Sequence, residues 1–195
     1  VMLAVFMGGM YLAIDATAGE RERQSMEPLL LNPISRRQVV TGKIFATMAF
    51  SLTALLLTLI MYRLGLLFLP LDELGLRLNM GGGVLVSVFL MMLPVALVAA
   101  AVQTLVAAFS KGFREAQTYV SFLSFIPMVP GIWLALSPIK PSLSYMWVPL
   151  LNQSMLIQML SRDEAIPLYW HVPAWLTTAV LGGVLLYFAQ RCYAR

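Results

Sequence analysis

Residues 19–43 carry the sequence GERERQSMEPLLLNPISRRQVVTGK, a densely charged block between two long apolar runs. Across all 195 residues, 60% are hydrophobic and 11% are charged, and the mean hydropathy is +0.83. A soluble domain has about 25% charged residues and about 45–50% apolar ones. The composition therefore predicts an integral membrane protein with several spans, and the charged block is expected in a connection between two of them.

Five apolar runs are expected to cross the bilayer as helices. They cover residues 1–17, 44–62, 84–109, 118–136 and 172–190, and apolar sequence continues from the second run to residue 71. The predicted fold is therefore an all-α, polytopic helical bundle with five spans. From Val1 to Ile14 a helix reaches only about 21 Å, short of the ~30 Å hydrocarbon core. We therefore expect this chain to be a fragment that begins within a span.

The basic residues divide unequally between the two sides of the predicted membrane. One side holds Arg21, Arg23, Arg36, Arg37, Lys43, Lys111, Arg114, Arg191 and Arg195. The other side holds Arg63, Arg77, Lys140 and Arg162. The positive-inside rule places the larger set in the cytoplasm, together with the C-terminus. Arg63 lies about 30 Å along a helix from Lys43, so we expect it at the outer interface rather than on an intramembrane substrate path.

The charged block predicts a helix, a break and a second helix. Residues 20–23 can continue the first span, and Asn32 before Pro33 ends that helix because a residue before proline avoids the α region. Ser35 and Gln38 fit a capping box for the second span. Between them, residues 26–31 (MEPLLL) form an apolar face that either docks another protein or packs on its own bundle.

The long connection 137–171 is predicted to be external. Within it, residues 147–160 (WVPLLNQSMLIQML) are mostly apolar but too short to span, which predicts a re-entrant or interfacial helix. Trp147, Tyr169 and Trp170 suit an outer aromatic belt.

Few residues interrupt the apolar pattern of the spans. Pro94, Pro127 and Pro130 predict kinks that serve either gating or packing alone. The polar candidates for a conduit or substrate site are Asp15, Gln103, Asn152 and Gln153.

Sequence motifs of catalysis are absent. The TGK at residues 41–43 lacks the upstream glycine of a nucleotide-binding P-loop, because position 37 is Arg37. No HExxH or GxSxG pattern occurs. The single His171 excludes a site with two histidines, and the single Cys192 excludes an intrachain disulfide. We therefore expect a transporter, a channel or a scaffold, with no catalytic residue and no metal in this chain. The basic residues are expected to reflect membrane topology rather than nucleic-acid binding.

The charged block resembles the cytoplasmic segment of the type-2 ABC transporter permeases, most closely their sodium-efflux (NatB-type) branch. The matching positions are Ala18, Gly19, Glu20, Arg21, Glu22, Arg23, Ser25, Glu27, Leu29, Leu30, Pro33, Ile34, Ser35, Arg36, Gly42 and Lys43. SKGFREAQTY resembles a second cytoplasmic turn of that branch through Lys111, Glu115, Ala116 and Gln117, and VPLLNQSMLI resembles its external P-x-x-N segment through Pro149 and Asn152. Gln24 departs from the pattern, which usually has a glycine there.

The resemblance implies a function for the whole chain. Residues 1–195 would form one transmembrane permease domain, the last five of six spans, in the inner membrane of a bacterium or archaeon. It would pair with a second permease copy, as a homo- or heterodimer, and with a cytoplasmic ATPase subunit that binds the ATP and Mg²⁺. Residues 18–43 would be the coupling segment, in which contact falls on Gly19, Glu20, Arg21, Glu22, Arg23, Glu27, Leu29, Leu30, Pro33, Ser35 and Arg36. The second cytoplasmic turn would contribute Lys111, Arg114 and Glu115.

The implied activity is ATP-driven efflux, with Na⁺ as the substrate that the branch suggests. An exporter of drugs, peptides or lipid-linked molecules is the alternative within the same class. A membrane scaffold and an intramembrane protease are the alternatives from other classes, and the protease would need more histidines than His171.

Overall fold

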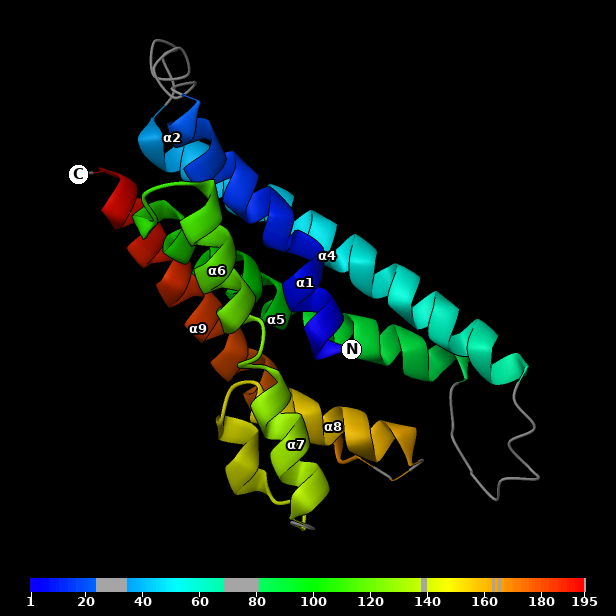
Figure 1. The fold of residues 1–195 in the computed structure, drawn as a ribbon. Coiled ribbons are helices and arrows are strands. Elements are labelled where there is room, and N and C mark those ends of the chain that lie inside the picture. Colours follow the sequence, from blue (N-terminus) through cyan, green and yellow to red (C-terminus); the bar gives the residue numbers. More distant parts are fainter. Residues whose placement is uncertain (24–34, 69–80, 138–139, 163, 165, 195) are drawn as a thin grey trace.

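The computed structural model describes residues 1–23, 35–68, 81–137, 140–162, 164 and 166–194, and in these residues the regular elements are helices (Figure 1). In chain order they are α1 (Met2–Ile14), η1 (Asp15–Gly19), α2 (Glu20–Glu22), α4 (Arg36–Leu67), α5 (Gly82–Phe109), α6 (Phe113–Leu123), α7 (Met128–Leu136), η2 (Leu143–Trp147), α8 (Leu151–Ser161) and α9 (Leu168–Ala194). The described residues contain five helical stretches long and apolar enough to cross a membrane. The prediction of an all-α polytopic bundle with five spans is confirmed.

The centre of the bundle is formed by α1, α4 and α5, which pack against one another, while α9 packs along α5 and α4. The largest apolar core lies among these helices and includes the fully buried side chains of Val5, Leu55, Met92 and Val95. α6 lies against α5 and α1, and α7 lies against α8 at one end of the bundle (Figure 1). Many large apolar side chains on the outer faces are exposed, as expected of helices that face lipid.

The first span continues as a helix beyond the apolar run, as the sequence predicts. A π-helical turn, η1, joins α1 to α2, so that helix extends unbroken from Met2 to Glu22. The predicted capping box before the second span is also present. Gln38 N donates to Ser35 Oγ at 3.3 Å, and Ser35 N donates to Gln38 Oε1 at 3.0 Å.

The fourth span differs from the prediction of one kinked helix over residues 118–136. It begins earlier, at Phe113, and is interrupted between α6 and α7. Pro127 has no backbone N–H, and around it the hydrogen bonds shorten to i,i+3 pairs such as Ile126 N to Leu123 O. Pro130 is tolerated in the first turn of α7, where its missing N–H would have had no intrahelical partner. Because α5 ends at Phe109 and α6 begins at Phe113, the turn between them is only residues 110–112.

The apolar part of the long connection is helical, as predicted. Of the predicted stretch 147–160, residues 151–160 lie in α8, and the 3₁₀ helix η2 precedes it. α9 begins at Leu168, four residues before the predicted start of the fifth span. Pro94 lies inside α5, and Pro173 lies inside the first turns of α9.

The charged ends of the helices gather as the charge distribution predicts. Figure 1 shows α2, the start of α4, the α5–α6 turn and the end of α9 at one end of the bundle. Gln190 of α9 donates to Thr41 Oγ1 of α4 at 2.9 Å at this end. α7 and α8, which Lys140 and Arg162 adjoin, lie at the opposite end.

Candidate functional site

Four successive charged residues, Glu20 to Arg23, each contact a different part of the charged end of the bundle. Glu20 forms an ion pair with Lys43, on the second turn of α4. The Lys43 side chain is only 9% exposed, whereas that of Glu20 is 31% exposed. This pair therefore joins the end of the first span to the start of the second.

Arg21 and Glu22 bind the two sides of the α5–α6 turn. The Arg21 guanidinium donates to the carbonyl oxygen of Ser110, the C-cap residue of α5. Glu22 Oε2 accepts from the backbone N–H of Phe113, the first residue of α6, at 2.8 Å. A cation at a helix C-terminus and a carboxylate at a helix N-terminus are each placed favourably with respect to the helix dipole. The N-cap residue of α6 is Gly112, which has no side chain, so Glu22 supplies the acceptor from another helix.

Arg23 turns back onto the first span. Its guanidinium lies 2.6 Å from Asp15 Oδ1, across the π-helical turn. A Cβ on Gly19 would lie 2.9 Å from the same carboxylate oxygen, so the absence of a side chain there lets Asp15 occupy this place. The structure thus places Asp15, a predicted conduit candidate, in an ion pair with Arg23 of the predicted coupling segment.

The second turn presents its charges to the outside. Lys111 and Arg114 are exposed, and Glu115 accepts from the Lys111 N–H at 2.7 Å, which closes the turn. Beneath it a small apolar cluster of Ile14, Ala18, Ala107, Ala116 and Val120 holds α6 against the first span. The rings of Tyr11 and Phe113 meet edge to face, with centroids 5.8 Å apart.

We call the charged end formed by residues 20–23, Ser35, Arg36, Lys111, Arg114 and Glu115 the coupling surface. Ser35 and Arg36 are exposed at the start of α4. Glu27, Leu29, Leu30 and Pro33, which the sequence also predicts to take part, lie outside the described residues. The structure therefore brings together both predicted cytoplasmic segments.

The three remaining conduit candidates do not form one site. Gln103 is fully buried in α5, and its Nε2 donates to the Phe6 carbonyl of α1. Its Oε1 lacks a hydrogen-bond partner, as do the buried hydroxyls of Thr104, Thr47 and Ser51. Asn152 and Gln153 lie at the other end of the molecule, on the first turn of α8.

Asn152 and Gln153 link α8 to α9. Asn152 Nδ2 donates to the Ala174 carbonyl at 3.1 Å and to Thr177 Oγ1 at 3.2 Å. Gln153 Nε2 donates to the same carbonyl at 3.1 Å and to Thr178 Oγ1 at 2.8 Å. The two amide oxygens accept from backbone N–H groups at the start of α8. Both side chains are buried and hydrogen-bonded, so in this conformation they fasten the external helix to the last span.

Sequence reasoning missed the partners that complete these contacts. Lys43 belongs to the resemblance pattern but is not among the predicted site residues, and its separation of 23 residues from Glu20 is too long for a local signal of a pair. The Phe113 amide and the Ser110 carbonyl are backbone groups, which a side-chain pattern cannot mark. Within the described residues, no group of three or more His, Cys, Asp or Glu side chains could hold a metal ion.

Comparisons with known proteins show the family of the chain. Residues 1–166 match the family model described as ABC-2 family transporter protein. The chain is 28% identical over 199 aligned residues to the ABC transporter permease protein NatB of Bacillus subtilis (strain 168), an alignment that covers all of this chain and 51% of that protein. The chain thus spans about half the length of this curated relative. No solved structure matches it.

Proposed function

The chain belongs to the ABC-2 family of transporter proteins, and from that membership we propose that it forms the membrane-spanning permease part of an ABC exporter. ATP hydrolysis by a separate cytoplasmic ATPase subunit drives the efflux, and this chain carries no catalytic residue. The bacterial or archaeal cytoplasmic membrane holds it, with the coupling surface and the C-terminus in the cytoplasm and a second permease copy alongside.

The observation that carries the proposal is the set of contacts made by residues 20–23. Glu20 joins α4, whereas Arg21 and Glu22 join the end of α5 and the start of α6. A partner that pushes on this exposed charged surface therefore acts on four spans together rather than on one loop. Packed elements of this kind move as rigid bodies, which is how a domain outside the membrane can shift helices inside it.

The transported species that we propose is Na⁺. Support for it comes from the resemblance of residues 19–43 to the sodium-efflux branch. Larger substrates such as drugs, peptides or lipid-linked molecules are the alternatives that the test below distinguishes.

The test uses the full-length permease co-expressed with its ATPase in inverted membrane vesicles. ²²Na⁺ uptake is followed with and without ATP, with a protonophore present to remove secondary antiport. We expect ATP-dependent uptake that is lost in Glu22→Lys, where a cation replaces the carboxylate that holds the start of α6. Membrane levels of the variant are measured in parallel, so that loss of protein is not mistaken for loss of coupling.

The outcomes separate the two parts of the proposal. ATP hydrolysis that continues without ²²Na⁺ uptake retains the permease and excludes Na⁺, and labelled lipid-linked or peptide substrates are then tested in the same vesicles. Uptake that is equal with and without ATP contradicts the ATP-driven mechanism itself.

A further inference from the structure

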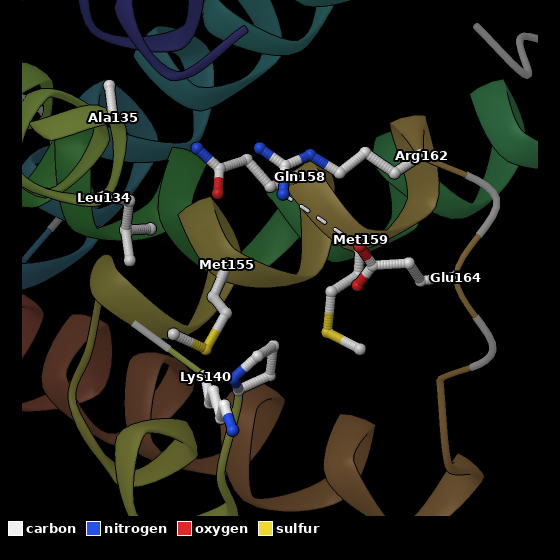
Figure 2. Close-up of a pocket in the computed structure, with 9 residues that line it drawn as sticks. Leu134, Ala135, Lys140, Met155, Gln158, Met159, Arg162 and Glu164 are labelled. Carbon is white, nitrogen blue, oxygen red and sulfur yellow. Dashed lines mark ion pairs between the residues drawn. The ribbon is translucent and has the colours of Figure 1, made fainter. Parts of the chain in front are cut away.

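A cavity of about 410 Å³ lies at the end of the bundle opposite the coupling surface, between the end of α7, residues 140–141 and one face of α8. Its apolar floor includes Leu134, Met155 and Met159, each less than 9% exposed. Figure 2 shows Met155 and Met159 between Lys140 on one side and Arg162 on the other. The volume is within the range of about 300–1,000 Å³ that small-molecule sites occupy.

The polar groups around this cavity carry a net positive charge. Lys140 and Arg162 are cations, Glu164 is an anion, and Gln158 adds a neutral amide. Arg162 Nη1 lies 4.0 Å from Glu164 Oε1, and both side chains are well exposed, at 67% and 44%. A pair this long and this exposed is weak and leaves most guanidinium donors free for another acceptor.

These two cations are conspicuous because basic residues are rare on this side of the protein. The sequence places only Arg63, Arg77, Lys140 and Arg162 on the side opposite the coupling surface. Two of these four line one cavity, whose floor is apolar and continuous with the end of a membrane span. Such a combination of a cationic rim and an apolar floor matches a ligand with an anionic head and an alkyl body.

We propose that this cavity binds the phosphate of an anionic phospholipid headgroup. Lys140 and Arg162 donate to the phosphate oxygens, and the first methylenes of the lipid lie on the thioethers of Met155 and Met159. Met side chains are suited to such a floor because they adapt their shape to flexible apolar ligands. The proposal is independent of the transported substrate and stands whether or not the chain exports Na⁺.

The test is native mass spectrometry of the full-length protein in a neutral detergent, because each bound molecule is resolved by its mass. The protein is titrated separately with a short-chain phosphatidylglycerol, with the matching zwitterionic phosphatidylcholine and with inorganic phosphate. We expect the phosphatidylglycerol adduct to form first. Lys140→Gln and Arg162→Gln should each weaken it about tenfold, the loss of one charge-assisted hydrogen bond.

Three further variants keep the result specific to this cavity. Arg63→Gln removes a cation on the same side of the protein but outside the cavity and should leave binding unchanged. Arg162→Lys keeps the charge and should retain most of the binding, and Glu164→Gln removes the competing carboxylate and should strengthen it. Each variant is first shown to elute as the wild type does on size exclusion.

The lipid and phosphate titrations distinguish the sources of the ligand. An inorganic phosphate adduct that needs Lys140 and Arg162, without a phosphatidylglycerol adduct, supports the phosphate site with a soluble phosphate as its occupant. The proposal would be overturned if each of the three probes bound the Lys140→Gln, Arg162→Gln double variant as tightly as it binds the wild type.

Discussion

Glu20 and Lys43 form an ion pair that joins the end of the first span to the second turn of α4. The Lys43 side chain is nearly buried, at 9% exposed. The Glu20 carboxylate therefore compensates for the water that the Lys43 ammonium group has lost. A buried cation that loses its partner costs more than the pair itself contributes. The pair therefore fixes how α1 and α4 meet at the coupling surface.

The first prediction is a charge-swap test of this pair. Glu20→Lys and Lys43→Glu should each lower the free energy of unfolding by about 1–3 kcal/mol, because each leaves like charges side by side in a partly buried place. The double swap should recover most of that loss. Thermal unfolding of the detergent-purified protein measures the loss of stability in each variant. If the loss in the double variant equals the sum of the losses in the two single variants, the pair is not formed.

The second prediction concerns the acceptor that Glu22 supplies to α6. Glu22→Ala should deprive the Phe113 amide, at the start of α6, of the carboxylate oxygen that accepts its hydrogen bond at 2.8 Å. The expected cost is about 1 kcal/mol, as for loss of a helix cap. Hydrogen exchange followed by mass spectrometry should show faster exchange in the peptide covering residues 110–116. Glu164→Ala, an acidic residue at the other end of the molecule, is the matched control and should leave that peptide unchanged.

The sequence predicts those parts of the fold that depend on local composition. Span number follows from apolar run length, and the Ser35 cap follows from two residues three apart. The continuation of the first span to Glu22 follows from the absence of any proline before Pro28. Each of these signals lies within a few residues, so it can be recognised without the tertiary structure.

The features that the sequence misses depend on contacts between distant segments. Glu22 and Phe113 are 91 residues apart, and their contact requires that η1 and α6 pack in the apolar cluster that includes the small side chains of Ala18 and Ala116. The interruption at Pro127 has a local cause, but whether proline bends a membrane helix or divides it depends on how neighbouring helices satisfy the freed backbone groups. The sequence predicts Asn152 and Gln153 as conduit residues because their types suit a conduit, yet both side chains donate to the Ala174 carbonyl, a contact that residue type alone does not indicate.

The third prediction tests the close packing of α1 on α4. A Cβ on Gly9 would lie 2.8 Å from the Thr47 backbone oxygen and would also meet the Ser51 hydroxyl. Gly9→Ala should therefore separate the two helices and lower the free energy of unfolding by about 1–3 kcal/mol. Gly65→Ala is the control, because nothing lies within 4 Å of its Cβ position in α4. That variant should be neutral or more stable by up to about 1 kcal/mol, since alanine favours helix.

The fourth prediction separates a structural role of Asn152 and Gln153 from a role in a conduit. Asn152→Ala should leave a buried carbonyl and a hydroxyl with fewer donors and lower the unfolding temperature, and Gln153→Ala should do the same. Transport per folded molecule should stay close to that of the wild type. A normal unfolding temperature with transport lost would instead assign these two amides to the substrate path.

The most direct test of the central claim is co-purification of the ATPase with variants of the coupling surface. Arg114→Glu reverses an exposed charge in the second turn, and Arg63→Glu reverses an exposed charge on α4 outside the coupling surface. The amount of ATPase retained by the full-length permease and the ATP-driven transport in inverted vesicles are measured for both. We predict that Arg114→Glu loses the ATPase and the transport together, while Arg63→Glu keeps the ATPase. Equal retention of the ATPase by the two variants, with equal transport, would contradict the assignment of this surface to coupling.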